Sequence, residues 1–286
     1  MEIILYIIFH NDIITKKYNG FARTGEKMTK KKIIIIVSII ALILAMVSIV
    51  TTFLIKNNKP KEDVNKINVE ELENNFNNIF TNAIYPEIEE NKEKVYLAYD
   101  IETEETGKFS IDTNIPNINI DTQIVKNINN DIFNSFAKNI IKVMEQTGAY
   151  TIYNIDYVSY INNNILSLVI KCTLKEGSNP QRVIIKTYNY DMEKDKLLTL
   201  QEIINLKGLD GNETQNKILE KIQKEIDKFS EIANSGYNIY KRDINDLIYK
   251  IPNTTNFFLG NENVLYIVYS YGNNSYTSEV DLIICQ

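Results

Sequence analysis

Residues 150–174 read YTIYNIDYVSYINNNILSLVIKCTL. Two runs rich in β-branched and aromatic residues, 150–161 and 165–174, lie on either side of Asn162-Asn163-Asn164. Such runs around a short polar turn predict an antiparallel β-hairpin. Alternate residues of the second run are apolar and predict a strand face that points into a core: Leu166, Leu168, Ile170, Cys172 and Leu174.

A helix and two strands are predicted before this hairpin. Apolar residues recur every three or four positions from 69 to 83, which predicts a helix that ends before Pro86. Strands are predicted at 95–101 and 108–120. Because proline has no N–H group to donate to a ladder, Pro116 predicts that the second of these is an edge strand or a bulged strand.

The next predicted helix begins after Asp121, its expected N-cap, and ends before Gly148. After the hairpin, residues 181–190 predict a third strand of the same group. Thr199-Leu-Gln-Glu202 has the residue types of a capping box, in which the threonine hydroxyl and the glutamate carboxylate each accept a backbone N–H group. This motif predicts the start of a short helix.

The last part of the chain is predicted to add two helices and three strands. Asn212-Glu-Thr-Gln215 predicts a cap and a helix through residue 233, and a short helix is predicted at 243–249. The strands are predicted at 256–259, 264–271 and 277–284. Strands joined by short polar turns, with helices between groups of strands, predict an α+β fold on an antiparallel sheet. We divide it into a first part, 69–190, and a second part, 191–286.

A membrane span is predicted at residues 33–55, IIIIVSIIALILAMVSIVTTFLI. These 23 residues carry no charge, and a helix of this length reaches about 35 Å, enough to cross a hydrocarbon core of about 30 Å. A cleavable signal peptide is the alternative, but its apolar region is shorter and is followed by small residues. Phe53-Leu54-Ile55 leads directly into Lys56, which favours an uncleaved signal anchor.

The charges on either side of the span predict its orientation. Seven Lys and Arg residues precede the span and four lysines follow it within residues 56–68, so we expect the N-terminus inside and the C-terminal part outside. Residues 1–32 then form a short cytoplasmic segment and residues 56–68 a tether. Met28, which precedes Thr29 and three lysines, has the context of a natural start. We hypothesise that residues 1–27 are absent from the native product.

Three segments of the predicted outer part carry a resemblance to a known family. They are IPNINI at 115–120 followed by the helix from Asp121, YNYDMEKDKLLTLQEI at 188–203, and NFFLGNENVLYIVYSY at 256–271. Together they resemble the ectodomain of the anti-sigma-V factors, the lysozyme-sensing membrane proteins of low-GC Gram-positive bacteria. The same pair of uncharacterised domains precedes the catalytic domain of some peptidoglycan deacetylases.

The resemblance covers roughly residues 95–286 and has two departures. Family members continue after the final tyrosine strand through Ala-Pro and a Gly, where this chain has Gly272-Asn-Asn-Ser-Tyr-Thr-Ser-Glu279. The segment before the span shows no amphipathic helix for a sigma factor, so sigma-factor binding is not expected. What the resemblance implies is a cell-envelope module that binds or senses a wall component or a basic wall-acting protein such as lysozyme.

The chain after residue 55 is acidic, with 24 Lys and Arg against 34 Asp and Glu residues and a net charge of −10. This charge disfavours nucleic acid as a partner and favours a basic protein or a neutral glycan. The only histidine, His10, precedes the span, so the outer part holds no His-based catalytic or metal site. We expect no catalytic residue, metal or cofactor, and a non-enzymatic protein. A carboxylate-dependent cell-wall hydrolase and a structural membrane tether are the alternatives.

Tyrosine is the residue type that the sequence offers for ligand binding. An exposed tyrosine face can stack on sugar rings or anchor a protein partner, whereas the structural alternative is cross-strand packing on a half-buried sheet. We select the residues around the last predicted turn as the candidate binding patch: Tyr266, Tyr269, Tyr271 and Tyr276. The structural alternative is the more common role of strand tyrosines.

Two other groups of residues are assigned structural roles. The cluster Glu102-Thr-Glu104-Glu105 lacks the alternating ligands and central glycine of a calcium loop, and we interpret it as a solvated surface. Cys172 and Cys285 differ in strand phase, so their sulfur atoms are expected on different sides of the sheet. Two free thiols are therefore predicted.

Overall fold

The computed structural model describes residues 69–87, 93–234, 240–273 and 275–286. The predicted cytoplasmic segment, membrane span and tether lie outside these ranges. Within them, no helix has both the length and the apolar character needed to cross a membrane. The described residues belong to one compact unit that begins at Asn68.

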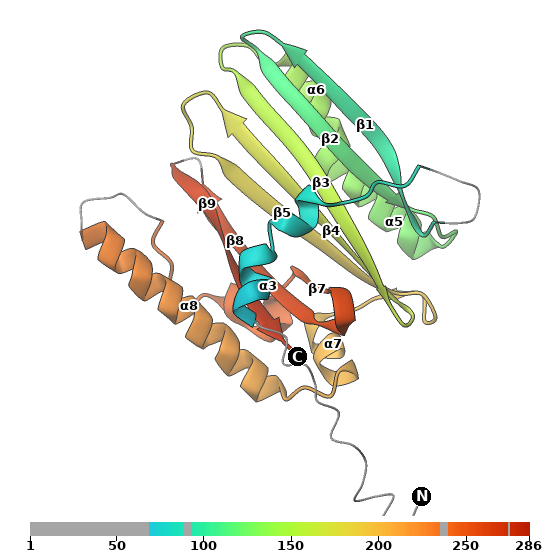
Figure 1. Ribbon diagram of the computed structural model, residues 1–286, viewed down its shortest axis with the longest axis vertical. Coiled ribbons are helices and arrows are strands. Elements are labelled where there is room, and N and C mark those ends of the chain that lie inside the picture. The colour runs from blue at the N-terminus through green and yellow to red at the C-terminus, as the bar shows by residue number, and fades with distance from the viewer. Residues whose placement is uncertain (1–68, 88–92, 235–239, 274) are drawn as a thin grey trace, which may run out of the picture. The chain divides into compact units, whose positions relative to one another are not determined.

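A six-stranded sheet forms the larger part of this unit, in the order β1-β2-β3-β4-β5-β6 (Figure 1). Its strands are β1 (Val95–Glu105), β2 (Phe109–Ile118), β3 (Thr151–Asn162), β4 (Ile165–Glu176), β5 (Arg182–Asp191) and β6 (Lys196–Leu197). All neighbours are antiparallel except β2 and β3, which are parallel. The structure is therefore of the predicted α+β class with an antiparallel-rich sheet, and the parallel pair departs from the prediction.

The hairpin predicted at residues 150–174 is confirmed as β3 and β4. Asn162 pairs with Ile165 at its end, and Asn163 takes the left-handed conformation with φ of 54°. Asparagine tolerates this conformation better than most residues, which explains the polar turn. Leu166, Leu168 and Ile170 all point into the core, as predicted.

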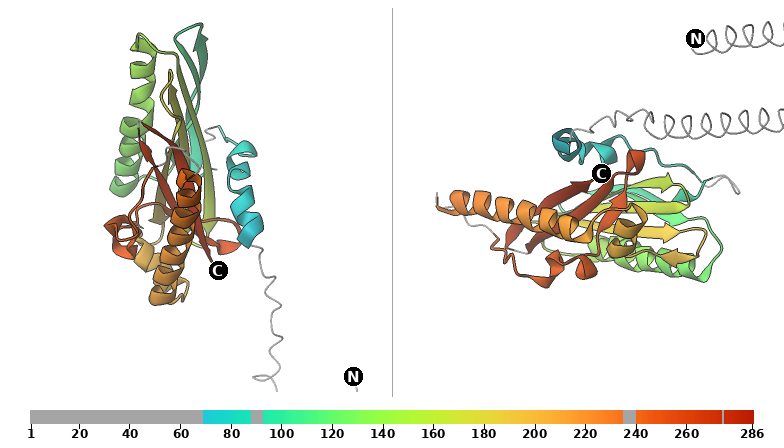
Figure 2. Two further views of the ribbon diagram at one scale, coloured as in Figure 1. Left: turned by 90° about the vertical axis from the view of Figure 1, so that its left-hand side faces the viewer. Right: turned by 90° about the horizontal axis from the view of Figure 1, so that it is seen from below.

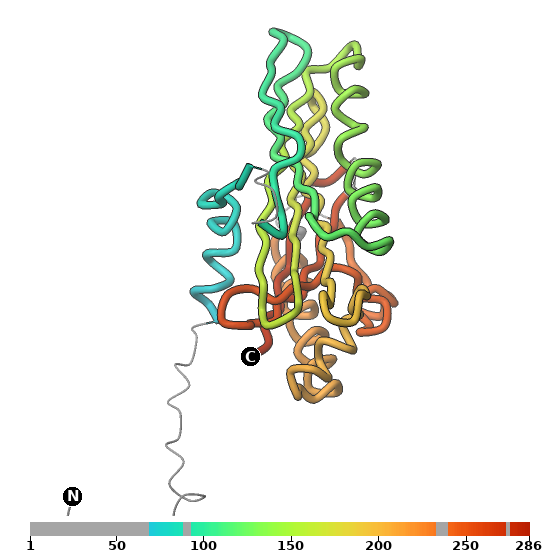
Figure 3. Tube along the Cα trace, turned by 90° about the vertical axis from the view of Figure 1, so that its right-hand side faces the viewer, coloured from blue at the N-terminus to red at the C-terminus, as the bar shows by residue number. Residues whose placement is uncertain are grey.

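Helices cover both faces of the six-stranded sheet. Figures 2 and 3 show the helices of the β2–β3 crossover against one face and α3 on the other side. The crossover consists of α5 (Gln123–Ile132), a π-helical turn η1 (Phe133–Ala137) and α6 (Lys138–Glu145). Its N-cap is Thr122, whose side chain accepts the N–H of Val125, and not Asp121 as predicted. The first predicted helix is broken into α3 (Val69–Asn75) and α4 (Asn78–Thr81).

The position of Pro116 differs from the prediction of an edge strand. β2 lies between β1 and β3, and Pro116 pairs with Leu97 next to a bulge in β1. On its other side, the ladder between β2 and β3 ends at Thr113 and Ile155. The missing N–H of Pro116 is therefore tolerated because β3 forms no ladder with that end of β2.

A three-stranded antiparallel sheet forms the second layer, in the order β7-β8-β9. Its strands are β7 (Phe257–Leu259), β8 (Leu265–Asn273) and β9 (Tyr276–Cys285), close to the predicted bounds. Two helices accompany it, α7 (Leu200–Leu206) and α8 (Gly211–Asn234). The short helix predicted at 243–249 is wrong. Among the described residues between α8 and β7, the helical turns are the 3₁₀ turns η2 (Leu247–Tyr249) and η3 (Ile251–Asn253), and a third 3₁₀ turn, η4 (Asn261–Asn263), precedes β8.

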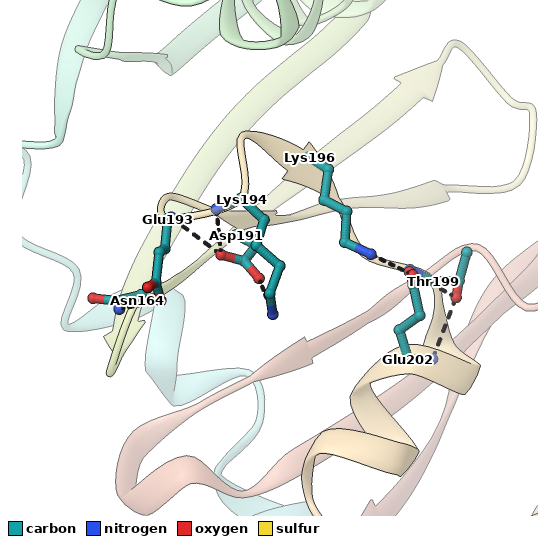
Figure 4. A network of polar contacts seen from close by, with 7 residues as sticks. All are labelled: Asn164, Asp191, Glu193, Lys194, Lys196, Thr199 and Glu202. Atoms are coloured by element: carbon teal, nitrogen blue, oxygen red, sulfur yellow. Dashed lines mark hydrogen bonds and ion pairs between the residues drawn. The ribbon is translucent and has the colours of Figure 1, made fainter.

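The connection from β5 to α7 is fixed by a network of polar contacts (Figure 4). The carboxylate of Asp191, 4% exposed, accepts the backbone N–H groups of Glu193 and Lys194 at 3.1 and 3.0 Å. The predicted capping box is confirmed, because Thr199 and Glu202 each accept the other's backbone N–H group. Lys196 Nζ lies 2.5 Å from Glu202 Oε1 and forms an ion pair with the same carboxylate. The turn and the helix start are therefore set by local side chains.

Two hydrophobic cores lie in this unit. The first is formed by residues between 95 and 190 from the six-stranded sheet, α5, η1 and α6. The second is formed by residues between 198 and 285 from α7, α8 and one face of the three-stranded sheet. The predicted division at residue 190 stays a prediction.

The outer edge of β7 is hydrogen-bonded by side chains of the larger sheet. Phe257 donates its N–H to Thr187 Oγ1 at 3.0 Å, and its carbonyl accepts from Asn189 Nδ2 at 2.6 Å. Leu259 donates its N–H to Ser167 Oγ at 3.1 Å, and its carbonyl accepts from Asn162 Nδ2 at 3.2 Å. Every backbone group of these two residues is thereby satisfied away from β8. The two sheets are joined through side chains rather than through a continuous ladder.

Removing Asn189 should destabilise the protein. Asn189→Ala leaves the buried carbonyl of Phe257 without its side-chain donor and the hydroxyl of Ser167 without its acceptor, so the free energy of unfolding should fall by about 1–3 kcal/mol. Chemical denaturation measures this change. Asn154→Ala is the matched control, because Asn154 is half-buried on β3 and its side chain bonds no other described residue. Equal losses in the two variants would contradict the role assigned to Asn189.

Both cysteines should be unreactive in the folded protein. They are free and each is 1% exposed, and burial raises the pKa of the Cys172 thiol to about 12. Because the thiolate is the reactive form, Ellman's reagent at pH 8 should react with neither cysteine until the chain is unfolded, and then with both. Immediate reaction of the folded protein, or a missing thiol after unfolding, would contradict this expectation.

Candidate functional site

The four candidate tyrosines do not share one surface. Tyr266 lies on one face of β8, 8% exposed, with its ring stacked on Phe258 at 4.6 Å and an interplanar angle of 3°. Phe258 also contacts the rings of Phe76 and Tyr160. A side chain at Gly260 would come within 2.6 Å of the Tyr266 ring, so glycine is required for this stack. Tyr266 is therefore part of the packing between the two sheets and the turn that joins α3 to α4, which contains Phe76.

Tyr269 lies on the opposite face of β8 and is also buried. It is 7% exposed, its hydroxyl lies 2.8 Å from the Thr254 hydroxyl, and its ring packs against Tyr249. Tyr271 and Tyr276 are half-buried. Both contact the ring of Tyr240, at 6.0 and 5.9 Å between centroids. The structure thus brings Tyr271 and Tyr276 together and separates them from Tyr266.

Tyr271 packs against a buried ion pair between Arg242 and Asp281. The two charged side chains are 2% and 4% exposed. The Cζ atom of Arg242 lies 3.9 Å from the centroid of the Tyr271 ring, a cation–π contact. Burial raises the pKa of Asp281 to about 6, although the charge of Arg242 lowers it. No spacing in the sequence indicated this pair, since its members are 39 residues apart.

A second feature is a group of carboxylates that we call the acidic face: Asp100, Glu102, Asp112 and Asp156. They come from β1, β2 and β3, on the sheet face opposite α5 and α6. Glu102 is the direct cross-strand partner of Asp112 in the β1–β2 ladder. Like charges in this position repel and destabilise a sheet.

The electrostatic effect of this arrangement is visible at Asp112. Burial raises the pKa of its carboxyl, and the charges of Asp156, Glu102 and Asp100 raise it further. No ion pair within the described ranges involves any member of the acidic face. Asp156 accepts one hydrogen bond, from the Tyr85 hydroxyl at 2.9 Å.

The lysine closest to the acidic face along the strand ladder, Lys171, does not neutralise these charges. Lys171 on β4 is the cross-strand partner of Asp156, but its ammonium group lies over the Phe80 ring and 3.5 Å from the Asn77 side chain. The described residues also contain no group of three or more His, Cys, Asp or Glu side chains placed to hold a metal ion. The four carboxylates of the acidic face therefore form no ion pair with Lys171 or with another cation of the described residues.

Sequence reasoning selected tyrosines and missed the acidic face as a site. A signal was present, because Asp100, Glu102 and Glu104 alternate along one strand and so share a face. Glu102 was interpreted as solvated, and it is exposed in the structure. What the sequence did not contain is the register that places Asp112 opposite Glu102.

Comparison with known proteins gives structural neighbours only. No family model matches the chain, and no curated protein matches it. A DUF3298 family protein from Pseudomonas aeruginosa is 12% identical, with a TM-score of 0.36 over 66% of this chain and 86% of that chain. A member of the same family from Bacteroides fragilis is 13% identical, with a TM-score of 0.36 over 61% of this chain and 80% of that chain. The structural neighbours thus belong to an uncharacterised domain family, and the resemblance to anti-sigma-V factors stays a prediction.

Asp112→Asn should stabilise the protein at neutral pH. The substitution removes one of two facing negative charges, so the free energy of unfolding should rise by about 0.2–1 kcal/mol. Because the pKa of Asp112 is raised in the folded state, its ionisation destabilises the fold as the pH increases. The gain should therefore disappear towards a pH of about 3, where the carboxyl is protonated in both states.

Denaturant unfolding at several pH values measures this effect. Glu220→Gln is the matched control, because it removes an exposed negative charge from the middle of α8, away from the helix ends. A loss of stability in Asp112→Asn at neutral pH, or the same gain in the control, would show that repulsion within the acidic face is negligible.

Proposed function

We propose that the chain is a membrane-anchored, non-enzymatic cell-surface protein whose outer part binds or senses a basic wall-acting protein. The observation that carries this proposal is the acidic face, with its facing carboxylates Glu102 and Asp112. A folded protein gains nothing from such a pair by itself, because the pair repels. A cationic partner would offset the repulsion between the two carboxylates, and the same two charges would stabilise the complex with that partner.

Three further observations support this ligand class. The chain after residue 55 has a net charge of −10, which speeds the approach of a basic protein over distances of several ångströms. The acidic face belongs to one continuous sheet, so its charges sit on a rigid support. The resemblance to lysozyme-sensing anti-sigma-V factors names lysozyme as the first partner to test, while the predicted span supplies the anchor.

The proposed mechanism needs only binding. Lysine and arginine side chains of the partner would approach the four carboxylates of the acidic face, and exposed charges of this kind mainly affect the association rate. Apolar and hydrogen-bonding contacts around the charges would then set the lifetime of the complex. Transmission of the signal would follow through the tether and the span.

Binding of lysozyme to the full chain in nonionic detergent tests the proposal. Calorimetry should give a micromolar or tighter complex that persists at a salt concentration of about 0.15 M, where long-range attraction is largely screened. The double variant Glu102→Gln/Asp112→Asn should lower the association rate constant by about threefold to tenfold, because it halves the charge of the acidic face. Stopped-flow fluorescence or surface plasmon resonance measures this rate.

Two controls separate specific from general attraction. Glu145→Gln/Glu220→Gln removes the same charge from exposed positions on α6 and α8 and should change the rate much less. Cytochrome c is an equally basic protein and should bind more weakly than lysozyme. The proposal fails if lysozyme binding disappears at the higher salt concentration, if both proteins bind alike, or if the control variant loses as much. Binding of neutral wall glycans by both variants would then favour the glycan alternative.

A further inference from the structure

A charged cleft of about 560 Å³ lies between α3, α8, β4 and β9. We call it the α8–β9 cleft. The residues that the argument uses are Glu73, Lys221, Glu225, Tyr271 and Glu279, all of which line it. The cleft involves no member of the acidic face. Its volume is several times that of one amino acid and falls in the range of ligand sites in proteins.

The buried Arg242–Asp281 pair borders the cleft: Asp281 lines it, and Arg242 lies behind the lining residues. Asp281 and Tyr271 line the cleft, and Arg242 contacts both of them. The guanidinium also lies 5.6 Å from the centroid of the Phe229 ring, on α8. The Arg242 guanidinium is therefore held in place by its ion pair with Asp281 and by the rings of Tyr271 and Phe229.

Two hydrogen-bond donors next to the Arg242–Asp281 pair have no acceptor. Arg242 Nη2 and the Tyr271 hydroxyl are both buried and bond no atom of the described chain. A guanidinium nitrogen can only donate. An unsatisfied buried polar group destabilises a fold. Two such donors on neighbouring side chains point to an acceptor that arrives with a ligand, and a carboxylate suits a guanidinium best.

The walls of the cleft indicate the rest of the ligand. Four acids and four bases surround it when Arg242 is included, so its net charge is zero: Glu73, Glu225, Glu279, Asp281, Lys171, Lys221, Lys228 and Arg242. Lys221 is paired with Glu73 at 2.9 Å and with Glu225 at 3.4 Å. Glu279 takes part in no ion pair within the described ranges and is free to receive an ammonium group. A ligand that carries one positive and one negative group therefore matches the site.

We propose that the α8–β9 cleft binds a short peptide with free termini. The C-terminal carboxylate accepts hydrogen bonds from Arg242 Nη2 and the Tyr271 hydroxyl, and the N-terminal ammonium group lies beside Glu279. Both donors lie beneath the surface of the cleft, so a neighbouring side chain moves when the ligand enters. This assignment makes Tyr271 a ligand-binding residue in a site that is independent of the acidic face.

Calorimetry of the full chain with trialanine tests the proposal. Trialanine should bind, whereas N-acetyl-trialanine amide, which lacks both terminal charges, should bind at least tenfold more weakly. Tyr271→Phe removes one donor but keeps the ring on Arg242, and should weaken trialanine binding by about tenfold to a hundredfold. Glu279→Gln should weaken trialanine but leave an N-acetylated peptide with a free carboxylate unchanged.

The thermal unfolding of Tyr271→Phe distinguishes binding from a structural role. Its unfolding temperature should be unchanged or higher, because the hydroxyl that it loses is unsatisfied in the folded protein. Tyr96→Phe on β1 is the matched control and should bind trialanine like the unchanged protein. The proposal is overturned if trialanine does not bind at millimolar concentration, if the blocked peptide binds equally well, or if Tyr271→Phe has no effect on binding. None of these results bears on lysozyme binding.

Discussion

The hydrogen bonds from the face of the larger sheet to the edge of β7 hold the two layers together. Ser167 and Asn189 are direct partners in the β4–β5 ladder, and both are almost fully buried. In a sheet face that packs on another layer, such polar side chains are favourable only when their partners are in place. Here those partners are the backbone groups of Phe257 and Leu259. The same contacts cover a strand edge that would otherwise be free to pair with another chain. One short strand thereby fixes the position of β8, β9 and the helices that pack on them.

This rigid frame explains how two differently charged sites exist in one unit. At the acidic face the charges are alike, three of the four carboxylates are exposed, and none forms an ion pair among the described residues. The fold therefore tolerates a repulsion that the rest of the sheet offsets. Around the α8–β9 cleft most charges are paired, and the Arg242–Asp281 pair is buried, where a low dielectric requires a partner. Exposed like charges favour long-range attraction of a large basic partner. Buried donors and acceptors in fixed positions favour a small ligand whose charged groups form the hydrogen bonds that the protein leaves unmade.

The sequence predicted what depends on neighbours along the chain. The hairpin around Asn163 and the capping box of Thr199 and Glu202 each lie within a few residues, and both are confirmed. Pro116 was assigned to an edge or a bulge from its missing N–H group, but its environment depends on where the β2–β3 ladder ends. The acidic face required the register between Glu102 and Asp112, and the α8–β9 cleft required Arg242 to meet a carboxylate 39 residues away. Neither contact can be recognised from the spacing of residues in the sequence.

The tyrosines show why composition alone is a weak guide to a binding surface. Tyr266 and Tyr269 are three positions apart in one strand, so they lie on opposite faces. Tyr269 belongs to the second core, whereas the Tyr266 ring stacks on Phe258. Tyr271 shares its face with Tyr269 but lies beyond the packed part of the sheet, where β8 meets α8 and the Arg242 segment. Its ring is therefore used for packing while its hydroxyl is not. A tyrosine whose ring is satisfied and whose hydroxyl is not differs physically from its buried neighbours. The Tyr157 hydroxyl is also buried without a partner, but Tyr157 does not line the α8–β9 cleft, whereas Tyr271 does. Its place in the cleft, together with its unpartnered hydroxyl, is the reason that Tyr271 is proposed as a ligand contact.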